Sequence, residues 1–233
     1  MRKLLPLVLL SAFISSNAYA ADQAKLNARI DAAHAVLHEL MDTPDHGLPD
    51  SVASHATCIV VVPSFKKGAF IVGAQYGQGV VTCRTGHGWS APAFIQLTGA
   101  SFGLQAGGQA TDLVLVGTTR DAVQRLLHDK VKLGGDASVA AGPVGRSTSA
   151  NTTEIANAAF LTYSRNKGIF AGVDLTGDVV HQNTDDTMAY YGSDVTYEKI
   201  LSGRVPVKPS SAHFVRTVNQ LFHASGAHAA GAH

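Results

Sequence analysis

Short apolar runs separated by glycine and proline recur along the chain, and they constrain its fold more than any other feature. Residues 58–62 form a nearly continuous apolar run, and residues 70–76 alternate between two faces. Further runs of this kind cover 80–83, 93–97, 113–116, 160–164, 169–175 and 179–182. Such runs, bounded by turn residues, are typical of β-strands. Glycines inside them indicate bulges, bends or close backbone approach, so we predict a strongly curved sheet.

Three segments instead show helical periodicity. Apolar residues follow a 3.6-residue repeat in 22–42, 119–129 and 211–224, with Thr118 or Thr119 as the N-cap of the second. A short helix is also expected from Asp185 toward Tyr191. We therefore predict an α+β fold: a curved, mostly antiparallel, glycine-rich β-sheet, built as a sandwich or half-barrel, with packed amphipathic helices.

Composition excludes several classes of protein. The chain has 233 residues, is 45% hydrophobic and carries a net charge of +1. These values fit one large domain or two small ones and exclude a disordered chain. The chain lacks the basic balance of a nucleic-acid-binding protein, so no nucleic acid is expected as a partner.

Residues 1–20 have the pattern of a secretory signal peptide. Arg2 and Lys3 precede an apolar stretch, and Ala18-Tyr19-Ala20 supplies a small-x-small cleavage sequence. We expect an exported protein of the periplasm or envelope, with a single domain at 21–224 and a flexible Ala/Gly/His tail at 225–233. In such a compartment Cys58 and Cys83 can form a disulfide, although two strand cysteines are equally well explained as small core residues.

Two similar basic segments are the strongest candidates for binding. Residues 66–73 (KKGAFIVG) recur as 166–172 (NKGIFAG), and each copy places cations beside a glycine with an aromatic residue nearby. The copies are either two halves of a pseudo-symmetric sheet or the common chemistry of glycine-containing hairpins. Cations for phosphate and an apolar tip suit a peripheral membrane contact, whereas two solvated hairpin turns explain the same residues equally well.

Other motifs point to chemistry less specifically. Gly99-Ala100-Ser101-Phe102-Gly103 matches a nucleophile elbow, but a glycine-rich segment follows it where a helix is required. Residues 142–147 resemble a truncated phosphate-binding loop and can equally be a structural turn. His34 and His38, one helical turn apart, and the histidines of the tail have the spacing of loose metal ligands, although such histidines more often border a core.

An ordered set of motifs resembles the SYLF lipid-binding domain family over about residues 22–200. The motifs are GAQYGQG (73–79), GWSAP (88–92), SFGLQAG (101–107), LG (133–134), GPVGR (142–146), YSRNKGIFAG (163–172) and YYG (190–192). The resemblance implies a compact module that binds membrane lipids, catalyses no reaction and needs no cofactor. Eukaryotic relatives bind phosphoinositides and actin, often beside an SH3 domain. The export signal favours an exported bacterial branch that binds anionic phospholipid, so we do not expect actin as a partner.

These arguments give a set of expected site residues. Headgroup contacts are assigned to the cations Lys66, Lys67, Arg146, Arg165 and Lys167. Apolar membrane contacts are assigned to Phe65, Phe70 and Phe170, of which the last two are equally well explained as core. The alternatives are a protein-binding structural component of the envelope and a secreted serine hydrolase that uses Ser101.

Overall fold

Side chains of the central strands alternate between two hydrophobic cores, one on each face of a curled sheet. In strand β1 (Cys58–Ala69), Ile59 and Val61 pack into one core, and Val60 and Val62 pack into the other. All four are fully buried, as expected for a strand that is covered on both faces. The run at 58–62 is apolar throughout for this reason.

A computed structural model describes residues 5–42, 48–69, 72–102, 107–144, 157–166 and 169–222. The other helices and strands are α1 (Leu5–Met41), α2 (Asp50–His55), β2 (Val72–Thr85), β3 (Gly88–Trp89), β4 (Ala93–Phe102), β5 (Gly107–Gly117), α3 (Arg120–Leu126), β6 (Lys130–Lys132), β7 (Val139–Ala141), β8 (Phe160–Asn166), β9 (Ile169–Gly172), β10 (Val179–Gln182), α5 (Thr184–Tyr191), α6 (Tyr197–Leu201), the 3-10 turn η1 (Pro209–Ser211) and α7 (Ala212–Leu221).

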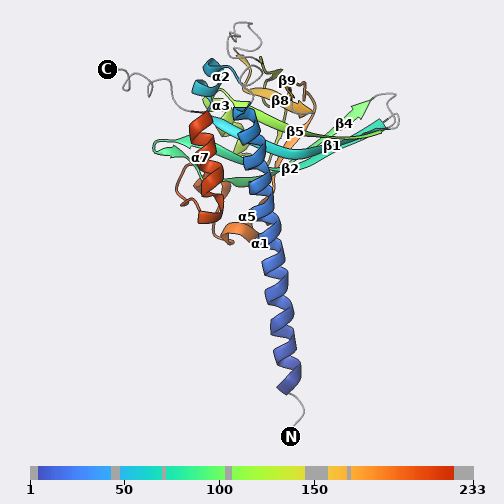
Figure 1. The fold of residues 1–233 in the computed structure, drawn as a ribbon, viewed down its shortest axis with the longest axis vertical. Coiled ribbons are helices and arrows are strands. Elements are labelled where there is room, and N and C mark those ends of the chain that lie inside the picture. Colours follow the sequence, from blue (N-terminus) through green and yellow to red (C-terminus); the bar gives the residue numbers. More distant parts are fainter. Residues whose placement is uncertain are drawn as a thin grey trace.

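The sheet has the strand order β6-β10-β4-β2-β1-β5-β8-β7, with β3 paired to β2 and β9 paired to β8 (Figure 1). Every pairing between strands is antiparallel except that of β7 with β8. The sheet curls into a half-barrel. This arrangement confirms the predicted α+β class and the predicted curved, mostly antiparallel sheet.

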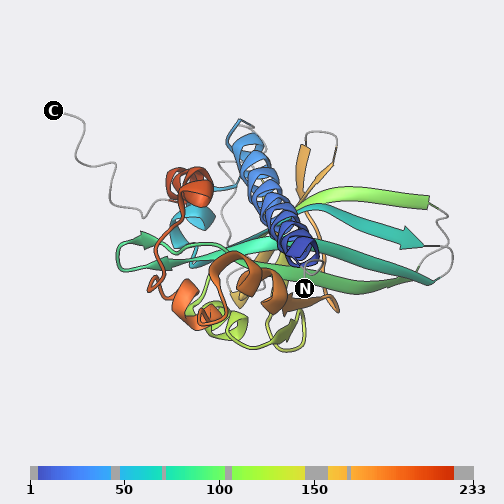
Figure 2. The same cartoon turned by 90° about the horizontal axis from the view of Figure 1, so that it is seen from below.

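Helices cover both faces of this sheet. Helix α1 crosses one face and packs against α7 and α5, as Figures 1 and 2 show from two directions. Leu26, Ile30 and Leu37 of α1 and Phe214 of α7 belong to the core on that face. Helices α3 and α6 contribute to the core on the opposite face. Within the described residues, no helix is long and apolar enough to cross a bilayer.

The predicted helices are observed, three with small changes in length and one as part of a longer helix. Thr119 caps α3, because its side chain accepts a hydrogen bond from the Ala122 backbone N–H at 3.2 Å. Asn183 caps α5, whose start near Asp185 was predicted. The segment predicted at 22–42 is the second half of the longer helix α1.

Two strands are longer than the sequence pattern predicts. The expected basic turn around Ser64-Phe65-Lys66-Lys67-Gly68 is instead part of β1, which continues past Pro63 through a shift in register. Ser64 takes a left-handed conformation there, with φ of 51°. Likewise, β2 is one strand where two were predicted. Gly79 lies at its centre because a Cβ there would come within 2.1 Å of the Val61 carbonyl oxygen.

Both copies of the internal similarity form antiparallel hairpins. β1 pairs with β2, and β8 pairs with β9, where Asn166 lies opposite Ile169. Strand β5 lies between β1 and β8 and pairs with both. The first basic segment is therefore part of a strand; of the second, the structure describes only Arg165 and Asn166, at the end of β8.

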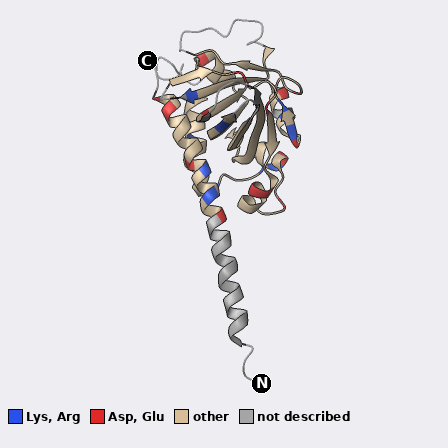
Figure 3. Cartoon of the chain, turned by 90° about the vertical axis from the view of Figure 1, so that its right-hand side faces the viewer, with Lys and Arg blue, Asp and Glu red and all other residues tan. Residues whose placement is uncertain are grey.

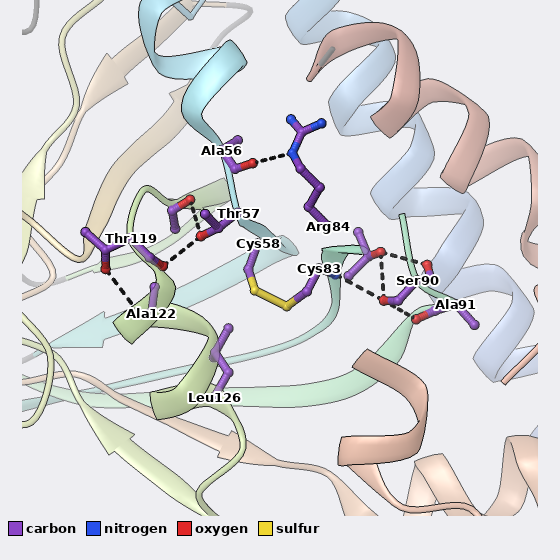
Figure 4. The surroundings of a disulfide bond; sticks show 12 residues. Ala56, Thr57, Cys58, Cys83, Arg84, Ser90, Ala91, Thr119, Ala122 and Leu126 are labelled. Carbon is purple, nitrogen blue, oxygen red and sulfur yellow. Dashed lines mark hydrogen bonds between the residues drawn. A yellow bond between two sulfur atoms is a disulfide. The ribbon is translucent and has the colours of Figure 1, made fainter. Parts of the chain in front are cut away.

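Cys58 and Cys83 form a disulfide between the directly opposed strands β1 and β2 (Figure 4). Both cysteines are fully buried. Close by, the Arg84 guanidinium donates to the Ala56 carbonyl oxygen at 2.9 Å and lies 4.8 Å from the centre of the Trp89 ring. The disulfide thus joins β1 to β2, and Arg84 connects β2 to the residue that follows α2 and to the Trp89 ring.

Candidate functional site

A groove of about 310 Å³ lies where α1 crosses strands β1 and β2. Eight residues line it: Arg29, Ala32, Pro63, Ser64, Lys66, Tyr76, Gly77 and Gln78. The volume is at the lower limit of small-ligand sites. A polar headgroup fits such a space, whereas a pair of acyl chains does not.

Arg29 is the cation that α1 contributes, and its position is fixed. Its guanidinium donates to Asp186 Oδ2 at 2.6 Å and to Gln78 Oε1 at 2.8 Å. It also lies 5.4 Å from the centre of the Phe94 ring. Asp186 neutralises much of the charge, so Arg29 supplies oriented N–H donors more than free positive charge.

Lys66 is the second cation of the groove and is exposed. In the part of the chain that the structure describes, no carboxylate forms an ion pair with it. Tyr76 lies directly opposite Lys66 across the β1–β2 pairing and is 45% exposed. The groove therefore combines an uncompensated ammonium group with an amphipathic ring.

The backbone around Ser64 shapes the entrance to the groove. The Asp112 carboxylate accepts a hydrogen bond from the Ser64 backbone N–H at 2.9 Å, which holds the left-handed turn. After this turn, Lys66 faces α1 and Phe65 faces the opposite core. The bulge thus directs Lys66 into the groove.

This arrangement suits binding of an anion more than catalysis. An uncompensated ammonium and fixed guanidinium donors are the groups that hold a phosphate oxygen. None of the groove residues is a histidine, cysteine or carboxylic acid. The donors of the groove therefore favour an anionic ligand.

The structure separates the cations that the sequence groups together. Lys67 follows Lys66 on β1 and points to the opposite face, where its Nζ lies 5.7 Å from the centre of the Phe65 ring. Arg165 is ion-paired with Glu39 and with Asp112, so it is not a free cation. Arg146 and Lys167 lie outside the described residues.

Two of the three expected apolar contacts, Phe65 and Phe170, are not on the surface. Phe65 is fully buried, and Phe170 is 1% exposed. Neither ring therefore presents an apolar surface to a membrane in this structure. Phe65 fits where Gly77 leaves space, because a Cβ on Gly77 would come within 2.8 Å of the phenyl ring. Phe70 lies outside the described residues.

Among the described residues, the other motifs do not form a catalytic or metal site; residues 145–147 of the phosphate-loop-like segment and the histidines of the tail lie outside the described residues. Ser101 is a strand residue of β4, and the next described element is strand β5, so the strand–turn–helix arrangement of a nucleophile elbow is not observed.

The His34 ring contacts the His213 ring on α7, with 4.8 Å between centres. Burial, together with the neighbouring His213 and His38, lowers the pKa of His34. Among the described residues, no three His, Cys, Asp or Glu side chains are placed to hold a metal ion.

Arg29, Tyr76 and Gln78 belong to the groove although the sequence did not single them out as site residues. In the sequence, Arg29 is one cation of a predicted helix that also carries acidic residues, so nothing marks it as a site residue. Tyr76 and Gln78 fit the alternating pattern of an ordinary strand. Only the crossing of α1 over the sheet brings the three together.

Comparison with known proteins gives a consistent set of relatives. The family model Ysc84, described as "Las17-binding protein actin regulator", matches residues 98–221. LAS seventeen-binding protein 3 of Saccharomyces cerevisiae is 36% identical over 170 residues, which cover 71% of this chain and 37% of the yeast protein. SH3 domain-containing YSC84-like protein 1 of Homo sapiens is 33% identical over 171 residues, which cover 72% of this chain and 49% of the human protein. The chain thus spans half or less of the length of these relatives.

These names correct one expectation. The sequence analysis predicted that actin is not a partner, and this prediction is wrong. The family description names an actin regulator, and the yeast relative is named as a Las17-binding protein. The export signal was taken to exclude actin, and the names of the relatives do not support that exclusion.

Proposed function

Because the chain belongs to the Ysc84, or SYLF, family, we propose that it is a non-catalytic binding domain that recognises anionic phospholipid. The observation that carries this proposal is the groove beneath α1, in which exposed Lys66 has no carboxylate partner among the described residues and fixed Arg29 lies alongside. A phosphodiester is the headgroup element that such a pair of cations recognises. The groove takes the headgroup, and the acyl chains remain in the bilayer.

Vesicle co-sedimentation tests this function directly. The purified chain is mixed with phosphatidylglycerol vesicles or with phosphatidylcholine vesicles, each at low and high salt. We expect binding to phosphatidylglycerol that weakens with salt, because each cation near an anionic surface contributes about 1 kcal/mol and is screened by ions. Absence of binding to either vesicle would overturn the proposal.

A matched pair of variants assigns the binding to the groove. Lys66→Ala removes the uncompensated cation and is expected to weaken binding about fivefold. Lys130→Ala is the control, because Lys130 is also an exposed strand lysine but lies on β6, at the edge of the sheet. Equal losses in both variants would indicate attraction to overall charge and would exclude the groove.

A protein partner from actin assembly is the second candidate function. The family description and the yeast relative's name favour it, because the first refers to an actin regulator and both refer to binding of Las17. We propose that the domain contacts such a partner through a part of its surface outside the groove. Co-sedimentation with actin filaments tests this, and filament binding that survives Lys66→Ala would separate the two functions.

Export stays part of the proposal. The basic and apolar pattern of residues 1–20 supports cleavage after Ala20 and an envelope location of an exported bacterial branch. Mass spectrometry of the protein recovered from its native cell tests this, with a mature chain starting at Ala21 as the expected result. An intact N-terminus on the native protein would overturn it.

A further inference from the structure

The four central strands continue beyond their outer neighbours as a separate arm. Strand β10 pairs with β4 only over residues 95–98, and β8 pairs with β5 only over residues 112–117. We call the remaining four-stranded ribbon the β-arm; it comprises residues 66–69, 72–76, 99–102 and 107–111. Figure 2 shows it projecting from the body, with α1 crossing near its base.

The β-arm carries positive charge and no negative charge. The sequence contains no Asp or Glu from Ser51 to Thr111, a stretch that includes the whole arm. The only charged side chains of the arm are those of Lys66 and Lys67. In Figure 3, which faces the side on which the arm projects, the acidic residues lie on other elements. This charge pattern is complementary to an anionic surface.

The two lysines lie on opposite faces of the arm. Lys66 pairs with Tyr76 and Ala110, and it faces the groove. Lys67 pairs with Gln75 and Gln109, and successive strand residues point to opposite sides. A flat membrane lying against either face would meet only one of these lysines. A membrane that meets the end of the arm surrounds both.

The exposed residues toward the end of the arm suit entry into a bilayer interface. Gly68, Ala74 and Ala100 are small, exposed and uncharged. Ala69 pairs with Gly73 close to the end, about 10 Å along the strand from Lys66 at 3.3 Å per residue. Tyr76, which lies opposite Lys66, is set back by the same distance, and Lys67 by about 7 Å at 3.3 Å per residue. These positions match the depth at which tyrosine and lysine lie in membrane interfaces.

We propose that the β-arm enters an anionic membrane end-on, so that Lys66, Lys67 and Tyr76 lie at the depth of the headgroups. The inference rests on the proposed lipid-binding function and specifies how the domain meets the membrane. In this orientation the groove at the base of the arm opens at the level of the lipid phosphates. Groove and arm then bind the same layer of headgroups.

A fluorescent probe at the end of the arm tests the orientation. Ala74→Cys is labelled with the environment-sensitive dye NBD; Cys58 and Cys83 do not react because they are joined in a buried disulfide. Ser193→Cys, in an exposed segment after α5, is the matched control. On phosphatidylglycerol vesicles we expect NBD emission to rise several-fold at position 74, to shift to the blue and to be quenched by doxyl-labelled lipid, with no change at position 193.

Single lysine variants test the same orientation by affinity. End-on entry predicts that Lys66→Ala and Lys67→Ala each weaken vesicle binding about fivefold. Lys67→Gln, which keeps much of the stem that lies over Phe65, is expected to weaken binding as Lys67→Ala does. Thermal unfolding of each variant verifies that the fold is retained.

The outcomes separate this inference from the proposed function. Loss of binding in Lys66→Ala alone, or sedimentation without any change in NBD emission at position 74, would overturn end-on entry and leave lipid binding at the groove intact. No sedimentation of the unmodified chain with anionic vesicles would overturn both.

Discussion

The Asp178 carboxylate occupies the space that a side chain on Gly99 would need. A Cβ built on Gly99 would lie 1.6 Å from Asp178 Oδ1. Asp178 is 3% exposed, and its Oδ2 has no hydrogen-bond partner among the residues that the structure describes. Gln75 lies opposite Gly99 on β2, and its buried Oε1 likewise has no partner among those residues. Within the described part of the chain, two buried acceptors without donors thus share one face of the sheet.

Gly99→Ala is expected to destabilise the protein. The added methyl group would displace the Asp178 carboxylate from its place above β4, and overpacking of this kind costs about 1–3 kcal/mol. Urea unfolding measures the loss. Gly86→Ala is the control, because a Cβ on Gly86 meets nothing within 4 Å. Equal midpoints for Gly99→Ala and the unmodified chain would show that the contact with Asp178 is not tight.

Asp178 also gives stability a defined dependence on pH. Burial raises the pKa of Asp178 to about 6. The positive charge of Lys67 opposes this rise, and the negative charge of Asp174 adds a smaller increase. The folded state therefore binds the proton more tightly than the unfolded state does. Stability should increase as the pH falls from about 7 toward 4, because the buried carboxylate becomes neutral and can donate a hydrogen bond.

Asp178→Asn isolates this effect. The amide is neutral at every pH, so the variant should be more stable than the unmodified chain at pH 7.5, by at most about 3 kcal/mol, and should lack the increase toward pH 4. Urea midpoints at half-unit pH steps measure both. Asp174→Asn is the contrasting control, because hydrogen bonds from Thr176 lower the pKa of Asp174 and its contribution is lost as the pH falls. Parallel pH profiles for Asp178→Asn and the unmodified chain would contradict the assignment.

Loss of the disulfide is expected to lower stability without changing the fold. Cys58 and Cys83 are 25 residues apart, and closing a loop of that length is worth about 3 kcal/mol in the chain-entropy model. A Cys58→Ala, Cys83→Ala double variant should lose about this much in urea unfolding and keep its far-ultraviolet spectrum. The β1–β2 pairing on both sides of the bridge preserves the fold. A double variant as stable as the oxidised chain would show that closing this loop adds nothing to stability.

The sequence predicts the fold better than the site, for physical reasons. Alternation and turn residues are local, so the strand at 58–62 and the Thr119 cap were predictable. The continuation of β1 through Pro63 was not predictable, because whether a strand continues past a proline and a bulge depends on its pairing with the neighbouring strands. Lys66 and Lys67 are adjacent in sequence and suggest one basic patch, yet the strand geometry places them on opposite faces. Phe65 suggests an exposed tip, but Gly77 on the neighbouring strand leaves the space that buries it.

Arg165 should behave differently from Lys66 when replaced. Its guanidinium pairs with Glu39 on α1 and with Asp112 on β5, at 3.1 Å for the latter. Arg165→Ala leaves two partly buried carboxylates facing one another. Removing one partner from an ion-pair cluster costs several kcal/mol when the cluster is well buried and less when it is near solvent. We expect a loss of about 1–3 kcal/mol in urea unfolding.

Comparison of the two variants decides which cation binds lipid. Lys66→Ala should weaken vesicle binding and leave the unfolding midpoint unchanged, since exposed Lys66 forms no ion pair within the described residues. Arg165→Ala should lower the midpoint and, below its unfolding range, bind phosphatidylglycerol vesicles within about twofold of the unmodified chain, because its charge is already neutralised by two acids. A folded Arg165→Ala protein that binds as weakly as Lys66→Ala would mean that the guanidinium leaves its carboxylates to reach the headgroup. The ion-paired arrangement would then be the lipid-free state of the site.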